Sequence, residues 1–413
     1  MKNGYLSQYF DGVAVKVLSQ VEANILVSHQ HEFNGVEALR NLLGEPSGKV
    51  KYQAKCIYFT DSDDTPLDED GELTWYDARQ KAREERNVQR TEYRLYFSAN
   101  TVMQMANAGD ILIIAKTKKE RELLILVVEN ETTIAAQLLW LFGFSSLDHP
   151  GFSIREELET EQDRIAFTSR IILEILGIAV EISNETYLDD MLKKFNGVFP
   201  STKEFSAYAR TTLPDIEAHS DFDAVLMTCY EREEVLFRTL EKHIVAERLR
   251  KGFSGTTGVD DFFEFSISTH NKRKNRAGRA LENHLEFIFQ QNRLRFDRGS
   301  VTENNSKPDF LFPGITEYKD QTFDSINLAM LGVKSSCKDR WRQVLPEADR
   351  IETKHLFTLE SAISVNQTSQ MQQRLVQLVV PQKIVHTYKP KQQEWLFTLA
   401  NFIELVKEKQ AVL

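Results

Sequence analysis

Cysteine is scarce in this chain, and no long apolar run occurs in it. Its three cysteines, Cys56, Cys229 and Cys337, are odd in number and far apart, which excludes a disulfide framework and the paired spacing of a structural zinc site. The chain lacks the stretch of about 18 apolar residues that a membrane span requires. Its first residues, MKNGYLSQYFDG, do not resemble a secretion signal. We therefore expect a cytoplasmic protein.

Motifs for nucleotide-cofactor and acyl-transfer chemistry are also missing. There is no P-loop, no GxGxxG segment after a strand-like run and no GxSxG elbow. His29 and His31 are close in sequence, but no third ligand at a suitable spacing accompanies them, so a polar loop is a better interpretation than a metal site. The formal net charge of -10 argues against a protein that coats nucleic acid without sequence preference, although it allows local basic patches.

The chain is long enough for two or three domains, and 41% of its 413 residues are apolar, so it can bury more than one core. Short β-rich runs within residues 11–60 and 93–130 predict a small barrel or sandwich, which helical spacing over residues 154–182 closes. Residues 186–203 mix Asn, Gly, Pro and Ser and predict a linker. The expected domains are residues 1–185 and 204–413.

The second expected domain contains both helical and strand-like patterns. Long helical stretches precede four short apolar runs, PDFLFP, NLAMLGVK, HLFTLE and RLVQLVVP. Strands interleaved with helices predict an α/β or α+β sheet covered by helices. The whole chain is thus expected to join a β domain to an α/β domain.

Two short segments are locally basic on this acidic chain. Residues 79–94 carry six basic and three acidic side chains, and a solvated helix face and a nucleic-acid contact explain them equally well. Residues 271–279 carry five basic side chains and no acidic one, so contact with phosphate groups is the favoured interpretation there.

Charged residues stand at the ends of two of the apolar runs. Asp309 precedes the run FLFP, and Lys334 ends the run LAMLGVK. If these strands are neighbours, Asp309 can ligate a divalent cation while Lys334 polarises a phosphate or orients a water molecule, as phosphodiester hydrolysis requires. Glu282 and Glu286 share one face of an earlier helical stretch, either as a surface acidic pair or as additional carboxylates near a metal.

The segment after Lys334 has a helical pattern. Ser336 and Asp339 have the spacing of a capping box, and apolar residues recur at helical spacing at Trp341, Val344, Leu345 and Ala348. A helix is therefore predicted to begin near residue 337. Its first turns would present Lys338, Asp339 and Arg340 to a base edge or a phosphate. An ordinary amphipathic helix with a solvated face is the alternative, and the pattern alone slightly favours it.

Taken in order, the runs KNRAGRALENHLEFIF, KPDFLFP, VKSSCKDRWRQVLPEAD, HLFTLE and RLVQLVVP resemble the catalytic domain of EcoRII-like type II restriction endonucleases, over about residues 190–390. The resemblance implies a restriction-endonuclease-like PD-(D/E)xK fold, a mixed sheet flanked by helices. In this family the acid that usually precedes the lysine lies further downstream, and Val333 occupies its former position. The implied site residues are Asp309 and Glu347 as Mg²⁺ ligands, Lys334 as the catalytic lysine, and Glu282 and Tyr318 as further catalytic residues.

The same resemblance implies how DNA would be read. Lys338, Asp339 and Arg340 match the element that reads the outer base pairs of a CC(A/T)GG-like site, and their donors and acceptors suit guanine and cytosine. Tyr230 falls at about the position of a side chain that stacks on a flipped base, although it could equally be a core residue.

The N-terminal half is similar to the EcoRII effector domain, a B3-like β pseudobarrel with helices. The similar segments are VKVLSQVEA, SHQ and YDARQKAREERNVQRTEYR. The resemblance implies a DNA-binding surface with two arms, one formed by Lys16, His29 and Asn34 and the other by Arg83, Arg86 and Arg90.

These features together predict a Mg²⁺-dependent type II restriction endonuclease, regulated by its N-terminal domain. The resemblance implies that it acts on double-stranded DNA as a homodimer and is accompanied by a cognate DNA methyltransferase. The alternative is a sequence-specific DNA-binding protein with impaired catalysis. Pro346 motivates this alternative, because a proline inside the expected helix would bend the element that carries Glu347.

Overall fold

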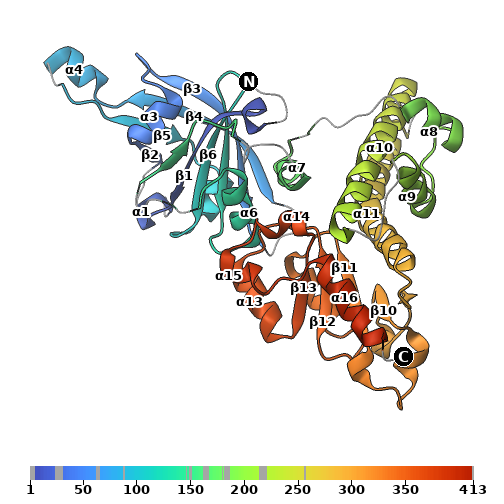
Figure 1. The fold of residues 1–413 in the computed structure, drawn as a ribbon. Coiled ribbons are helices and arrows are strands. Elements are labelled where there is room, and N and C mark those ends of the chain that lie inside the picture. Colours follow the sequence, from blue (N-terminus) through green and yellow to red (C-terminus); the bar gives the residue numbers. More distant parts are fainter. Residues whose placement is uncertain are drawn as a thin grey trace. The chain divides into compact units, whose positions relative to one another are not determined.

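The computed structural model forms two compact units, one of residues 1–178 with 362–367 and one of residues 179–361 with 368–413 (Figure 1). The residues that the structure describes are 5–23, 31–61, 66–86, 89–145, 147, 151–160, 167–178, 180, 187–213, 221–254 and 257–411. Among the helices of these residues, none is long and apolar enough to cross a membrane.

The first unit is built on one large sheet of eight strands in the order β2-β5-β4-β3-β7-β6-β1-β8. Strands β3 and β7 are parallel, and all other described neighbours are antiparallel. The strands are β1 (Phe10–Val17), β2 (Glu32–Gly35), β3 (Val50–Phe59), β4 (Leu67–Asp77), β5 (Tyr93–Phe97), β6 (Ile111–Thr117), β7 (Glu122–Val128) and β8 (Ser153–Arg155). In the described residues β2 and β8 are the two edges of the sheet and do not pair with each other, so hydrogen bonds do not close this sheet into a barrel.

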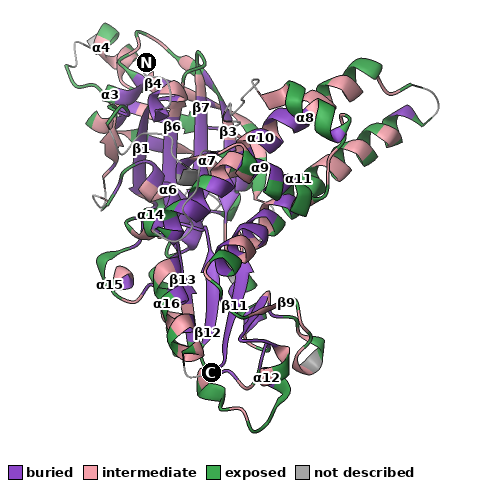
Figure 2. Cartoon of the chain, turned by 45° about the vertical axis from the view of Figure 1, so that its right-hand side comes forward, coloured by how far each residue is buried: buried purple, intermediate pink, exposed green. Residues whose placement is uncertain are grey.

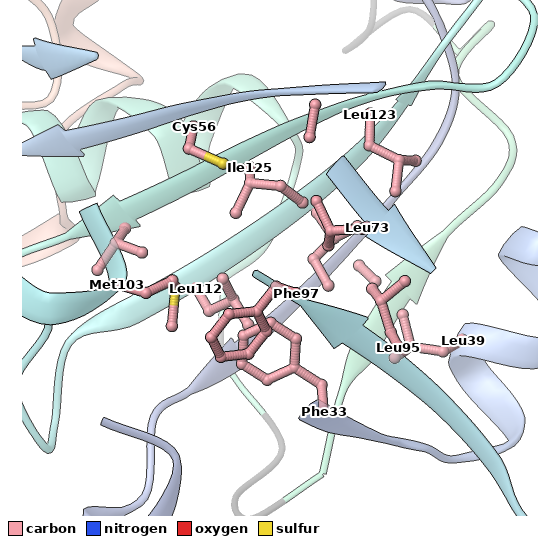
Figure 3. Packing of buried hydrophobic residues seen from close by; sticks show 14 of the residues in the cluster. Phe33, Leu39, Cys56, Leu73, Leu95, Phe97, Met103, Leu112, Leu123 and Ile125 are labelled. Carbon is pink, nitrogen blue, oxygen red and sulfur yellow. The ribbon is translucent and has the colours of Figure 1, made fainter. Parts of the chain in front are cut away.

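Short helices accompany this sheet, and aromatic side chains fill its core. Phe33 and Phe97, from the neighbouring strands β2 and β5, lie with ring centroids 4.8 Å apart close to Leu112 of β6 (Figure 3). The helical elements of this unit are η1 (Leu6–Gln8), α1 (Gln20–Ala23), α3 (Glu37–Leu43), α4 (Gln80–Arg86), α5 (Thr101–Met105), α6 (Thr133–Leu141) and α7 (Phe167–Ile175).

The second unit begins with helices. Two long helices, α10 (Phe222–Lys251) and α11 (Gly258–Gln291), lie side by side, and α9 (Thr202–Thr211) packs on both. Asp221 caps the first turn of α10 through the Ala224 amide, and Gly252 ends that helix in the left-handed region that favours glycine.

Within residues 186–203, where the sequence predicted a linker, the structure has helix α8 (Leu188–Phe195). Met191 and Phe195 are buried against Phe205, and the Tyr208 hydroxyl donates to Asp190 Oδ2 at 2.7 Å. Leu188, Met191, Leu192 and Phe195 have helical spacing, and burial of this apolar face outweighs the turn-like composition around it.

The sheet of the second unit has the order β13-β12-β11-β10-β9. Strand β10 is antiparallel to β9 and β11, whereas β11, β12 and β13 are parallel. Its strands are β9 (Asp297–Arg298), β10 (Phe310–Phe312), β11 (Ala329–Lys334), β12 (Lys354–Thr358) and β13 (Val376–Val379). The four apolar runs noted in the sequence thus become strands of one mixed sheet, as expected for the second domain.

Strand β11 is central and almost entirely buried, as Figure 2 shows for its neighbour β12 as well. Burial on both faces explains why its sequence is continuously apolar instead of alternating. The remaining helical elements of this part of the chain are η4 (Glu303–Asn305), α12 (Ile315–Lys319), η5 (Ser325–Asn327), η6 (Lys338–Val344), α13 (Val365–Gln373), α14 (Gln382–Val385), α15 (Pro390–Gln393) and α16 (Leu399–Gln410).

The 3₁₀ helix η6 packs closely on β11 at Gly332. A Cβ atom at this glycine would lie 2.7 Å from Val344 Cγ1, so Gly332→Ala is expected to destabilise the protein by about 1 to 3 kcal/mol because valine is stiff at χ1. Gly278→Ala is the matched control, since a Cβ atom there meets nothing within 4 Å and should stabilise α11 by about 1 kcal/mol or less. Urea denaturation of both variants measures the difference; equal midpoints would contradict the close approach.

Candidate active site

Asp309 and Lys334 meet where β10 begins and β11 ends. These strands are antiparallel neighbours, with Phe310 opposite Leu331, so the residue before β10 lies beside the last residues of β11. Asp309 Oδ2 accepts a hydrogen bond from the Val333 amide at 2.7 Å and from Lys334 Nζ at 3.2 Å. Both side chains are partly open to solvent, with exposed fractions of 20% and 17%. The condition stated from the sequence, that these strands be neighbours, is met.

Glu347 does not lie on a helix, which corrects the sequence prediction. The 3₁₀ helix η6 ends at Val344, and Pro346 follows it in a turn. Proline is common shortly after a helix end because it cannot continue the hydrogen-bond ladder. Pro346 therefore bends no helix, although Trp341 and Val344 are buried as their spacing predicted.

The predicted capping box at the start of this helix is also wrong. Cys337 occupies the N-cap position of η6, and its side chain makes no capping hydrogen bond. The Cys337 amide donates instead to the carboxylate of Glu360, which lies just beyond β12. The carboxylate that binds a backbone amide at the start of η6 therefore comes from the distant Glu360, and not from the neighbouring Asp339.

The Glu347 carboxylate is buried beside Asp309 and Lys334. Only 9% of the residue is exposed, and among the described atoms Oε2 has no hydrogen-bond partner. Burial raises the pKa of Glu347 to about 7; the charge of Asp309 raises it too, while those of Lys334 and Lys354 lower it. Two carboxylates and one lysine therefore form a single electrostatic cluster at the ends of β10 and β11.

Glu282 is held in an ion-pair network next to this cluster. Its Oε2 accepts from Arg298 of β9 at 2.6 Å and from Arg279 at 3.2 Å. Arg298 also donates to Glu286 at 2.7 Å. Since β9 pairs with β10, Arg298 connects Glu282 to the strand that follows Asp309.

Tyr318 of α12 is buried, and its hydroxyl faces the turn after Glu347. The hydroxyl donates to Glu303 Oε2 at 2.5 Å and accepts from the Arg350 amide at 3.3 Å. Burial raises the pKa of Tyr318, and the Glu303 carboxylate raises it further. The tyrosine is thus a neutral hydrogen-bonding group at neutral pH.

The residues expected to read DNA are only partly described. The backbone of Lys338 and Asp339 belongs to η6, but their side chains lie outside the described residues, and Arg340 is exposed. Tyr230 of α10 is buried, and its hydroxyl donates to the Ala277 carbonyl of α11 at 3.4 Å. Tyr230 is therefore a core residue here, so the stacking role has no support in its position.

Three of the five basic side chains at residues 271–279 form ion pairs within the protein, which the sequence did not predict. Arg273 pairs with Glu241 at 2.6 Å, Arg276 with Glu233 at 3.6 Å, and Arg279 with Glu282 at 3.2 Å. Two of these acids, Glu233 and Glu241, belong to the neighbouring helix α10. Two of the five basic side chains of this run therefore form ion pairs between α10 and α11.

The expected arm residues of the first unit have mixed surroundings. Lys16 is buried and pairs with Glu22 at 2.6 Å, so contact with DNA would first break this pair. Arg83 pairs with Asp77, the exposed Asn34 accepts from Arg94, and Arg90 is exposed. His29 and the Arg86 side chain lie outside the described residues.

Several polar residues around the candidate site were missed by sequence reasoning. Each is buried or hydrogen-bonded: Glu303, Arg350, Lys354 and Glu360. The available signal was the charge that begins and ends the strand-like run KHLFTLE, since charged residues at the ends of a buried strand require partners.

The raised pKa of Glu347 predicts a pH-dependent stability without divalent metal. Because the folded pKa of about 7 exceeds the ordinary value of 4.5, the folded state holds this proton more tightly, and stability falls as pH rises through this interval. Between about pH 5.5 and pH 8 the unchanged protein should lose about 2 kcal/mol more than Glu347→Gln. Urea denaturation in EDTA tests this; parallel pH profiles would contradict it.

Comparisons with known proteins find type II restriction enzymes. Residues 237–403 match the family model described as EcoRII C terminal. The type II restriction enzyme EcoRII of Escherichia coli is 42% identical over 206 residues, which are 50% of this chain and 50% of that protein. The type II restriction enzyme SsoII of Shigella sonnei is 25% identical over 150 residues, 32% of this chain and 48% of that protein. The chain spans about half the length of the curated relatives it matches.

Solved structures of restriction endonucleases also align with part of the chain. Metal-depleted Ecl18kI in complex with uncleaved DNA aligns with a TM-score of 0.43 and 17% identity, over 55% of this chain and 84% of that one. The complex of the restriction endonuclease PspGI with substrate DNA aligns with a TM-score of 0.40 and 15% identity, over 51% of this chain and 94% of that one. The sequence comparisons confirm the family resemblance found in the sequence motifs: residues 237–403 match the EcoRII C-terminal family model, and half of the chain is similar to the type II restriction enzyme EcoRII.

Proposed function

We propose that this chain is a divalent-metal-dependent type II restriction endonuclease that hydrolyses phosphodiester bonds of double-stranded DNA at a short site. The observation that carries the proposal is the cluster of Asp309, Lys334 and Glu347 at the ends of β10 and β11, within residues related to EcoRII. Carboxylates beside a lysine are the groups that phosphodiester hydrolysis with a metal requires.

The donor set suits Mg²⁺. Glu347 Oε2 is buried without a described hydrogen-bond partner, and a cation would compensate the cost of burying this charge. No group of three or more His, Cys, Asp and Glu side chains within the described residues could hold a metal. Mg²⁺ commonly uses one or two carboxylates together with water and substrate phosphates. Asp309 and Glu347 would hold it, and when bound it would stabilise the negative charge of the phosphate group.

Lys334 and Val333 would prepare the site before DNA arrives. The Val333 amide fixes the Asp309 carboxylate at 2.7 Å, and Lys334 Nζ lies 3.2 Å from the same oxygen. The ammonium group would stabilise charge on the phosphate and orient the attacking water. The carboxylate and the lysine need little rearrangement, because both extend from strands of one buried sheet.

The segment after Lys334 is proposed to read a CC(A/T)GG-like sequence. Arg340 and Lys338 can donate to guanine O6 and N7, and Asp339 can accept from cytosine N4. The support is the sequence similarity to EcoRII together with the position of these residues on η6 directly after the catalytic strand. On this proposal recognition and cleavage use one short stretch of chain.

Regulation and assembly are proposed from the sequence resemblance alone. The first unit would be a B3-like effector domain that binds DNA and regulates cleavage, the active form would be a homodimer, and a cognate methyltransferase would protect host DNA. The alternative, a DNA-binding protein with impaired catalysis, depended on a helix distorted by Pro346. Because η6 ends at Val344, that argument no longer applies.

Plasmid cleavage tests the proposal. With Mg²⁺, the protein is expected to cut a plasmid that contains CC(A/T)GG and to leave a matched plasmid without the site intact; EDTA should abolish cleavage. Gel electrophoresis and sequencing of the ends report the site and the cut position. Specific binding without cleavage, even when several copies of the site are present, would contradict the nuclease function and support the alternative.

Lys334→Ala tests the assignment of the lysine. Loss of a charge that acts on the phosphate should reduce the single-turnover rate by about 100-fold or more, while DNA affinity changes little. Lys407→Ala is the control, since Lys407 pairs with Glu404 at 2.9 Å on the surface of α16. Cleavage by Lys334→Ala at the unchanged rate would show that the active site has been assigned wrongly.

A further inference from the structure

The turn that follows Glu347 is held by side chains from outside it. Three successive amides, those of Ala348, Asp349 and Arg350, each meet a side-chain oxygen. The acceptors are Thr302 Oγ1 at 3.4 Å, Glu303 Oε2 at 3.3 Å and the Tyr318 hydroxyl at 3.3 Å, respectively. We name residues 348–351 the Glu347 turn. Its backbone amides donate to side chains from elsewhere in the chain, and these hydrogen bonds replace the backbone hydrogen bonds that a helix would have provided.

A buried lysine holds the carbonyl groups of the same turn. Lys354 Nζ donates to the Ala348 carbonyl at 2.7 Å and to the Ile351 carbonyl. Burial lowers the pKa of Lys354, while the charges of Asp349, Glu303 and Glu347 raise it. Lys354 thus pairs a buried ammonium group with main-chain oxygens directly beneath the Glu347 turn.

Arg350 is a residue of the Glu347 turn whose side chain binds the chain outside the turn. Its guanidinium group donates to the Tyr318 carbonyl, to Asp320 O at 2.9 Å and to Phe323 O at 2.7 Å. The Tyr318 hydroxyl accepts from the Arg350 amide, so the two residues bind each other through both backbone and side chain. The Glu347 turn and the segment after α12 therefore hold each other in place.

The contacts are needed because the turn is not favourable by itself. Ala348 has a φ of 50°, and the left-handed region costs a residue with a Cβ atom about 1 kcal/mol or more. Glu347 Oε2 has no described partner that could orient the carboxylate. The position of Glu347 is therefore set by the residues that hold the turn, as a metal-binding group requires.

We infer that Tyr318 and Lys354 are positioning residues, which hold the Glu347 turn so that the Glu347 carboxylate stays beside Asp309 and Lys334. Neither touches the reacting atoms. For Tyr318 this replaces the direct catalytic role that the family resemblance implied. The inference rests on the proposed function in one respect, since it takes Glu347 as a metal ligand.

Tyr318→Phe and Lys354→Met test the inference, with Tyr208→Phe as the matched control. Tyr208 is also a buried tyrosine that donates to a carboxylate, Asp190 at 2.7 Å, but Tyr208 lies on α9 and Asp190 on α8. Hydrogen exchange by mass spectrometry reports the amides of the Glu347 turn, calorimetry reports Mg²⁺ affinity without DNA, and single-turnover cleavage is measured over a range of Mg²⁺ concentrations.

Both test variants should exchange the amides of the turn faster and should weaken Mg²⁺ binding by about tenfold or more, as loss of groups that orient metal ligands commonly does. Saturating Mg²⁺ should restore the cleavage rate close to that of the unchanged protein. Lys334→Ala, by contrast, should not be rescued by Mg²⁺. Tyr208→Phe should leave exchange in the turn and Mg²⁺ affinity unchanged.

The inference fails if Tyr318→Phe slows cleavage at saturating Mg²⁺ while exchange and Mg²⁺ affinity stay unchanged, because the hydroxyl would then act in the reaction itself. It also fails if Tyr208→Phe alters the turn to the same extent. If Lys354→Met does not fold, Tyr318→Phe decides alone. If the unchanged protein never cleaves DNA, the proposed function fails, and hydrogen exchange still decides whether these side chains hold the turn.

Discussion

The Asp309 carboxylate accepts hydrogen bonds from both the Val333 amide and the Lys334 ammonium group, and the candidate active site depends on this junction of two strand ends. The junction is rigid because β10 and β11 are buried. A register shift of one residue would turn core side chains to the opposite face of the sheet. The sheet thus fixes two members of the site, whereas the third, Glu347, lies in a turn and requires tertiary contacts of its own.

Prediction from sequence succeeded where the burial of apolar side chains alone determines the local structure. Short apolar runs bounded by polar residues became β10, β11, β12 and β13, because burial on both faces leaves little alternative for such runs. The same argument placed Asp309 and Lys334 at strand ends, whereas the adjacency of these ends became known only from the sheet order. The long helices α10 and α11 followed from their periodic apolar residues in the same way. The mixed α/β class of the second unit was therefore accessible from sequence.

Prediction failed where distant residues decide the local structure. The predicted capping box at Ser336 does not form, and the Cys337 amide donates to the carboxylate of Glu360 instead. The helix that was predicted to continue through Pro346 ends at Val344. The basic run at residues 271–279 looked uncompensated, but acids of α10 pair with two of its five basic side chains. Local charge counts cannot reveal such partners, because the acids lie on a different helix. Tyr230 shows the same limit, since only tertiary packing could choose between surface and core.

The hold of Glu360 on the Cys337 amide has a mechanical consequence. Only Ser335 and Ser336 stand between Cys337 and Lys334, which ends β11. Three peptide units span at most about 10 Å, so Cys337 cannot move further than this from Lys334. A shift of η6 that exceeded this span would have to displace the end of β11. Chain length, as well as side-chain contacts, therefore limits how far η6 can move relative to the candidate active site.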